Sequence, residues 1–140
     1  MKGKKKGRLI PLLILIIVGV LVSTLGGKKD PVENKKAAAI EVTATELINA
    51  YEENEVKANK MYKGKELEVN GIISNIGETL GKKYVSLKVS NNKTLTRVQC
   101  MFPDEETEKL AELKKFDDVT IIGICEGCSI NVVLENCKIK

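Results

Sequence analysis

The feature that most constrains this sequence is an uncharged, mostly apolar run from Leu9 to Gly27. As an α-helix, this run would span about 28 Å, which is close to the ~30 Å hydrocarbon core of a bilayer. Pro11 would lie in the first turn of the helix, where a missing backbone N–H costs least. The run therefore predicts one transmembrane helix over residues 9–27.

The residues before this run predict its orientation. The segment Lys2–Arg8 holds five basic residues and no acidic one, whereas Lys28 and Lys29 follow the run. Because basic flanks stay on the cytoplasmic side, we expect residues 1–8 to form a cytoplasmic stub. The rest of the chain would then lie outside the cytoplasm, anchored to the cell membrane by a single span.

A cleaved signal peptide and a buried helix of a soluble protein are the alternatives to this anchor. A signal peptide has an apolar region of about 7–15 residues followed by a cleavage site of small residues. The apolar run is longer than that, and Thr24-Leu25-Gly26 fits a cleavage site poorly. We therefore favour an uncleaved anchor.

The charge is distributed unevenly along the chain. Residues 1–29 hold seven basic residues and no acidic one, so residues 30–140 hold 16 basic and 19 acidic residues. The exported part is thus mildly acidic, which argues against nucleic acid as its partner. The sequence contains no histidine, which excludes histidine acid–base catalysis and histidine metal ligands. It also shows no glycine-rich phosphate loop, so we expect neither an enzyme nor a bound cofactor.

Residues 28–42 combine charges, Pro31 and small residues without an apolar period, which is typical of a tether. An ordered domain is predicted over residues 43–140. Thr43 and Glu46 have the spacing of a capping box and predict the start of a helix. The buried stripe of that helix would be Leu47, Ile48 and Tyr51. A further helical turn is predicted over residues 56–61.

Alternating apolar residues predict five strands after Lys65. The alternation of the first strand changes parity between Ile73 and Ile76, and Gly71 beside that change predicts a bulge or a sharp bend. A loop is expected over Gly77–Lys82. The other strands are expected around residues 84–89, 96–102, 119–125 and 132–139.

A helix is predicted between the third and fourth strands. Asp104 is the expected N-cap, and Leu110 and Leu113 supply the inward stripe. An N-terminal helix followed by three strands, a helix and two strands is the layout of the OB-fold. The predicted fold class is therefore mainly β: a five-stranded Greek-key barrel, preceded by one transmembrane helix.

Four segments of the predicted domain resemble the tRNA-anti-like family of small bacterial OB-fold proteins. They are Ala50–Val56, Tyr62–Lys65, Val98–Phe102 and Val132–Cys137. The resemblance covers residues 43–140 and implies the fold, as well as an export signal or anchor before it. It implies no catalytic residue.

The sequence departs from the family pattern at Phe116. The segment Lys115-Phe116-Asp117 lies in a turn where Lys-Gly-Asp is expected. We expect Phe116 to avoid a positive φ or to pack onto the stripe of the preceding helix.

The four cysteines are the sharpest chemical feature. Cys125 and Cys128 have metal-knuckle spacing, but a zinc ribbon normally needs two such pairs and only one is present, so we predict no metal site. Cys100 shares a strand face with apolar residues and is predicted to be buried. The favoured disulfide is Cys125–Cys137, because the last two strands form a hairpin and an exported location permits the bond. A Cys125–Cys128 redox pair and four free thiols are the alternatives.

The predicted ligand face lies on the second and third strands. Its outward residues are Tyr84, Lys88, Arg97 and Met101. The loops Gly77–Lys82 and Cys125–Asn131 would flank it, as is usual in OB-folds. We expect a non-enzymatic binding or interaction module whose partner is a protein, a glycan or a small molecule. Binding of single-stranded nucleic acid and a structural role in a membrane complex are the alternatives.

Overall fold

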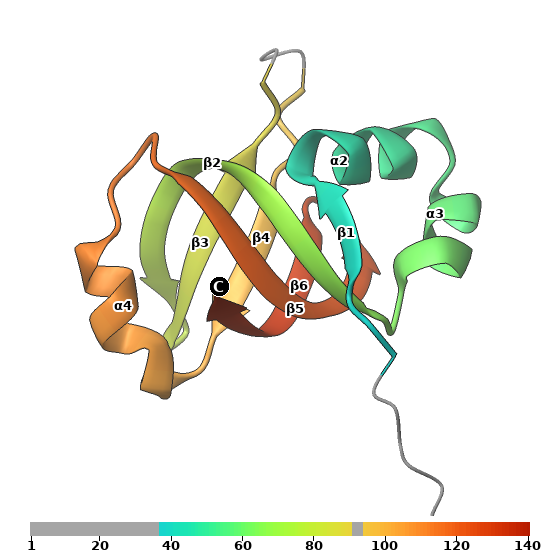
Figure 1. Cartoon of the computed structure of the whole chain (residues 1–140). Helices are drawn as coiled ribbons and strands as arrows, with labels where there is room; N and C mark the ends of the chain where they lie inside the picture. Colours follow the sequence, from blue (N-terminus) through green and yellow to red (C-terminus); the bar gives the residue numbers. More distant parts are fainter. Residues whose placement is uncertain (1–36, 91–93) are drawn as a thin grey trace, which may run out of the picture. The chain divides into compact units, whose positions relative to one another are not determined.

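A computed structural model describes residues 37–90 and 94–140 (Figure 1). The predicted cytoplasmic stub, the transmembrane segment 9–27 and most of the tether lie outside the described residues. Within the described ranges, no helix is long and apolar enough to cross a membrane.

Five strands close into a barrel (Figure 1). They are β2 (Glu66–Thr79), β3 (Lys82–Lys88), β4 (Val98–Phe102), β5 (Asp118–Cys128) and β6 (Val132–Ile139). The β2–β3, β3–β4, β5–β6 and β2–β5 pairs are antiparallel, and β4 and β6 are parallel. The barrel closes because the long strand β2 pairs with β5 along its first half and with β3 along its second. The predicted five-stranded OB-type barrel is confirmed.

The change of partner along β2 occurs at an irregularity in the strand. The register with β3 shifts between Ile73 and Asn75, so the predicted bulge is confirmed. Gly71, just before it, allows α2 to approach the barrel. A Cβ at position 71 would lie 2.8 Å from the Ala44 Cβ and 3.3 Å from the Leu87 Cβ.

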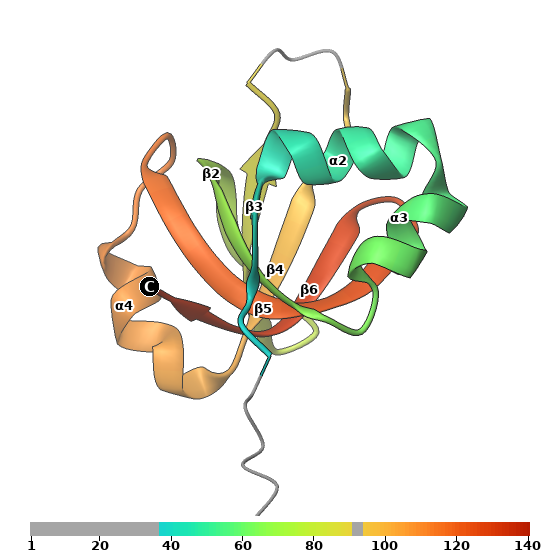
Figure 2. The same cartoon turned by 45° about the vertical axis from the view of Figure 1, so that its right-hand side comes forward.

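The helices α2 (Ala44–Glu53) and α3 (Glu55–Tyr62) precede the barrel. The predicted capping box begins α2, because Thr43 Oγ1 accepts the Glu46 N–H at 3.1 Å and Glu46 Oε2 accepts the Thr43 N–H at 2.9 Å. These bonds lower the pKa of Glu46. The predicted stripe Leu47, Ile48 and Tyr51 is buried in the core. Figure 2 shows α2 lying across one end of the barrel.

A short strand, β1 (Ile40–Thr43), precedes α2 and was not predicted. It pairs in parallel with β2, with Ile40 opposite Leu67 and Thr43 opposite Asn70. Ordered structure therefore begins a few residues before Thr43, within the segment assigned to the tether.

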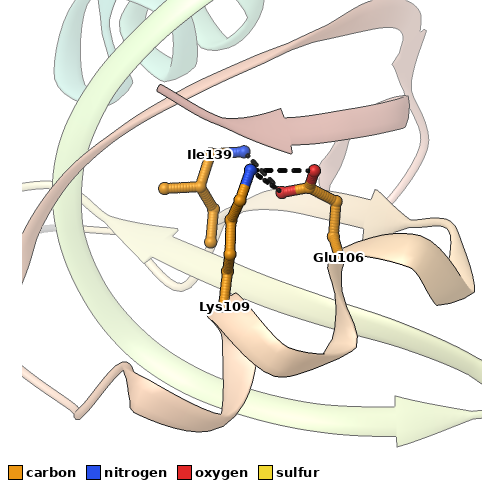
Figure 3. A network of polar contacts seen from close by, with 3 residues as sticks. All are labelled: Glu106, Lys109 and Ile139. Carbon is orange, nitrogen blue, oxygen red and sulfur yellow. Dashed lines mark hydrogen bonds and ion pairs between the residues drawn. The ribbon is translucent and has the colours of Figure 1, made fainter.

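The predicted helix between the third and fourth barrel strands consists of a 3₁₀ turn, η1 (Asp104–Glu106), and α4 (Thr107–Glu112). Leu110 is buried, as predicted. The predicted capping role of Asp104 is wrong, because its carboxylate lies 2.8 Å from Lys83 Nζ and caps no backbone N–H. Glu106 joins this segment to β6, since its Oε2 accepts the Ile139 N–H at 3.1 Å and its Oε1 lies 3.2 Å from Lys109 Nζ (Figure 3).

The predicted Gly77–Lys82 loop is wrong. The strand β2 continues to Thr79 and β3 begins at Lys82, so only Leu80 and Gly81 form the turn. Both have positive φ, 49° and 75°, which is the conformation of a tight type I′ hairpin turn. A tight two-residue hairpin turn therefore forms this end of the predicted ligand face.

Candidate ligand-binding face

The outer surface of β3 and β4 carries the predicted ligand residues. Val85, Leu87, Val98 and Cys100 point into the core, which places the residues between them on the outer surface. Tyr84 of β3 lies directly opposite Met101 of β4. Met101 is only 8% exposed. The structure therefore brings Tyr84 and Met101 together, with Tyr84 as the more accessible of the two.

Neighbours on β2 hold Tyr84 in place. The ring lies across Gly77, where a Cβ would fall 2.8 Å from the Tyr84 hydroxyl oxygen and 3.0 Å from Cζ. The Asn75 side-chain amide donates a hydrogen bond to that oxygen at 2.9 Å. Glycine at 77 thus makes room for the ring, and Asn75 fixes its far end. The sequence analysis placed Gly77 in a loop flanking the face and did not point to Asn75.

Side-chain amides continue this surface toward β6. Asn131 Nδ2 donates to Gln99 Oε1 at 3.3 Å, and Gln99 Nε2 lies 3.5 Å from Met101 Sδ. Asn131 Oδ1 accepts the Arg97 N–H at 3.0 Å, which joins the β5–β6 turn to the start of β4. We name this surface the Tyr84 face. It comprises Asn75, Gly77, Tyr84, Ser86, Gln99, Met101 and Asn131.

The two predicted cations of the face are engaged elsewhere. Arg97 Nη1 donates to the carbonyl oxygens of Thr94 and Thr96, both at 2.9 Å, and so organises the segment before β4. Lys88 Nζ lies 4.9 Å from the centre of the Phe116 ring. Neither is directed at Tyr84.

The lysines at the hairpin end of the face are also paired. Lys82 Nζ lies 3.7 Å from Glu135 Oε2, and Lys83 Nζ lies 2.8 Å from Asp104 Oδ1. The hydrogen bond between Lys83 and Asp104 raises the pKa of the lysine and lowers that of the carboxyl group. The Tyr84 face is therefore polar and nearly neutral.

A pocket of about 170 Å³ borders the face at this end. It is lined by Gly81, Lys82, Met101, Phe102, Pro103, Asp104, Glu135 and Asn136. Met101 belongs to both the pocket and the Tyr84 face, so the two surfaces are continuous.

Both expectations for Phe116 are wrong. Its φ is +76°, and its side chain is 70% exposed. The cause lies in the bulge of β2, where Ile73 O accepts the Phe116 N–H at 2.9 Å and the Ile73 N–H donates to Asp117 O at 3.0 Å. These two bonds hold the backbone of the turn in a conformation that glycine ordinarily supplies.

The structure contains no Cys125–Cys137 disulfide, and its four cysteines are free. The hairpin argument for this pair fails, because the register of β5 and β6 places Cys125 opposite Leu134, three residues before Cys137. The Cys125 thiol lies 3.4 Å from the Tyr51 hydroxyl. Cys137 lies instead beside Cys100, whose pKa is raised by burial and by a hydrogen bond with Cys137. Among the described residues, no three histidine, cysteine or acidic side chains form a group that could hold a metal ion.

Comparisons with known proteins agree with the fold. A lipoprotein of Klebsiella pneumoniae subsp. pneumoniae MGH 78578, inferred to bind nucleic acid, is 25% identical with a TM-score of 0.57, over 71% of this chain and 92% of its own. An OBody bound to hen egg-white lysozyme is 25% identical with a TM-score of 0.46, over 56% of this chain and 81% of its own. Asparaginyl-tRNA synthetase from Pyrococcus horikoshii is 19% identical with a TM-score of 0.42, over 56% of this chain and 20% of its own.

The last two likenesses are too weak to bear on function. No curated protein matches this chain. The sequence model of the tRNA_anti-like family matches residues 1–139, which is nearly the whole sequence. The chain therefore belongs to the tRNA_anti-like family.

Proposed function

We propose that this protein is a non-enzymatic OB-fold binding module at the outer face of a bacterial cytoplasmic membrane. Residues 9–27 would anchor it, and the barrel would lie outside the cytoplasm. The uncharged length of the apolar run and its basic N-terminal flank support the anchor and its orientation. The closed barrel and the family support a binding module.

The proposed ligand is an uncharged, hydroxyl-rich molecule, and an envelope glycan is the class that fits. One observation carries this proposal: Tyr84 is fixed over Gly77 among side-chain amides, while the neighbouring lysines are already paired. Amides and hydroxyl groups donate to and accept from sugar hydroxyls. A polyanion would instead require cations free to replace its counterions. OB-fold faces of this kind bind oligosaccharides as well as oligonucleotides.

Calorimetry on the full-length chain in lipid nanodiscs tests this proposal, with the tetramer of N-acetylglucosamine as the probe. We expect Tyr84→Ala to weaken binding about tenfold, equivalent to about 1.4 kcal/mol. Glu53→Gln, an exposed change at the end of α2, is the matched control and should bind like the unmodified chain. Equal affinity of Tyr84→Ala would exclude the Tyr84 face, and no heat at millimolar tetramer would exclude this ligand.

Single-stranded nucleic acid is the second candidate ligand. It is favoured by the likeness to the Klebsiella lipoprotein that is inferred to bind nucleic acid. Fluorescence anisotropy with labelled oligonucleotides at low salt tests it. Absence of binding at about 50 µM, near the weak end of non-specific affinities, would exclude it.

A further inference from the structure

An exposed aromatic ring and three lysines gather at the turn between α4 and β5. We name Lys88, Lys114, Lys115 and Phe116 the Phe116 cluster. Lys114, Lys115 and Phe116 are exposed, and the half-buried Lys88 places its ammonium group 4.9 Å from the ring centre. Within residues 37–90 and 94–140, none of the three lysines forms an ion pair. They therefore differ from the paired lysines beside the Tyr84 face.

Two carboxylates next to the cluster, those of Asp117 and Asp118, accept hydrogen bonds. Asp117 Oδ2 accepts the Lys114 backbone N–H at 2.8 Å, and Asp118 Oδ1 accepts the Asn70 side-chain amide at 2.8 Å. Neither carboxylate forms an ion pair with a lysine of the cluster, although both keep their negative charge. The turn thus presents three lysine ammonium groups that have no ion-pair partner among the described residues.

The backbone conformation of Phe116 lowers the stability of the fold. A bulky residue at φ +76° is strained. The bonds with Ile73 hold it there, and glycine would make the same turn without strain. Phenylalanine also leaves an apolar ring in water. Strain retained at an exposed aromatic residue is typical of a residue selected for binding.

The cluster continues the outer surface of β3. Tyr84, Ser86 and Lys88 are alternate residues on that side of the strand, so Tyr84 and Lys88 lie about 14 Å apart along it. An aromatic ring therefore lies toward each end of β3. Proteins that bind single strands place aromatic rings for base stacking along a path with cations for the phosphates.

We infer that the Phe116 cluster binds single-stranded nucleic acid, with a base stacked on Phe116 and the three lysines contacting the flanking phosphates. This inference rests on the second candidate function and assigns it a site. It does not depend on binding at Tyr84. An anionic lipid surface shares part of this chemistry, but it would not use the ring as a stacking platform.

The test uses the full-length chain in zwitterionic nanodiscs and a labelled oligothymidylate of about 12 nucleotides, within the range that one OB-fold covers. Phe116→Gly keeps the positive φ and relieves the strain. We expect its thermal midpoint to equal or exceed that of the unmodified chain. Its affinity for the oligonucleotide should nevertheless fall by between about fivefold and a hundredfold, the range for one lost stacking contact.

The lysines are tested through salt dependence. Changing Lys114 and Lys115 together to glutamine should reduce the slope of log affinity against log salt by about 1.4, since each phosphate contact on a single strand contributes about 0.7. Changing Lys57 and Lys60 of α3 to glutamine removes the same charge from another exposed surface and should leave affinity and slope unchanged. An equal effect of the two double changes would overturn the inference in favour of diffuse electrostatics.

Three other outcomes would also overturn the assigned site. Oligonucleotide binding that survives Phe116→Gly but is lost in Tyr84→Ala would refute the cluster while leaving the second candidate function in place. Absence of oligonucleotide binding by the unmodified chain would refute both. Phe116-dependent co-flotation with phosphatidylglycerol vesicles, without oligonucleotide binding, would instead identify a lipid contact.

Discussion

Tyr84 and Gly77 form a cross-strand pair in which the aromatic ring occupies the space of the missing side chain. A Cβ at position 77 would lie 2.8 Å from the Tyr84 hydroxyl oxygen. The same oxygen accepts a hydrogen bond from Asn75, two residues before the glycine. One short stretch of β2 therefore determines both the position of the ring and the direction of its hydroxyl group.

Gly77→Ala should displace the Tyr84 ring and break its bond with Asn75. We expect the free energy of unfolding to fall by about 1–2 kcal/mol, from overpacking and one lost hydrogen bond. Urea denaturation measures this loss. In a Tyr84→Ala background the same change should cost at least about 0.5 kcal/mol less, since the two residues are in contact. Strictly additive effects would contradict the contact.

Cys128 should be the first thiol to react in the folded protein. It is partly exposed, whereas Cys100, Cys125 and Cys137 are buried. Partial burial and the nearby Glu55 raise the pKa of Cys128, so its reaction with a disulfide reagent should be slow at pH 7 and accelerate at higher pH. Cys128→Ser should abolish this reaction.

Thiol counting also tests whether the four cysteines are free of disulfide bonds. Without reductant, four thiols should react in denaturant, the number in the sequence. Two fewer would indicate a disulfide that the structure does not contain.

Protonation of Glu106 should lower the stability of the domain in acid. The Ile139 N–H, and then Lys109, hold the pKa of Glu106 below its ordinary value in the folded state. Because the pKa of Glu106 is lower in the folded state, its carboxylate stabilises the fold at pH values above the pKa of glutamate in the unfolded chain, about 4.3. This stability is lost as the pH falls through the folded-state pKa. Glu106→Gln should cost about 1 kcal/mol at pH 7 and flatten the dependence of stability on pH below about 4.5.

Chemical denaturation between pH 7 and pH 3 measures the effect of Glu106. Glu108→Gln, an exposed change in the following helix α4, is the control and should leave the profile unchanged. A Glu106→Gln profile as steep as that of the unmodified chain would mean that other carboxylates determine the acid sensitivity.

Local patterns predicted much of the fold. Alternation in β2, β3 and β4 identified the inward residues, and the Thr43–Glu46 spacing identified the start of α2. The four residues of β1 were too few to show a period. The β2–β3 turn is shorter than the predicted loop, and its Leu80 adopts a positive φ that is uncommon for leucine. The positive φ of Phe116 could not be predicted from its neighbours in the sequence, because hydrogen bonds with Ile73 of β2 hold its conformation.

The candidate face was harder to predict because it depends on pairing between strands. Alternation placed Tyr84 and Met101 outward, but only the register shows that Tyr84 covers Gly77 and that Lys83 meets Asp104. The register of β5 and β6 separates Cys125 from Cys137, and no residue pattern in the sequence determines that register. The charge balance of residues 30–140 likewise did not show that the unpaired lysines gather around Phe116.

The Tyr84 face is tested most directly by mapping which residues respond to the ligand in solution. Side-chain amide resonances of Asn75, Gln99 and Asn131 should be followed by NMR in the full-length chain in micelles, while the N-acetylglucosamine tetramer is added. The proposal predicts that these three resonances shift together and that Tyr84→Ala abolishes the shifts. Shifts confined to other surfaces, or unchanged shifts in Tyr84→Ala, would contradict it.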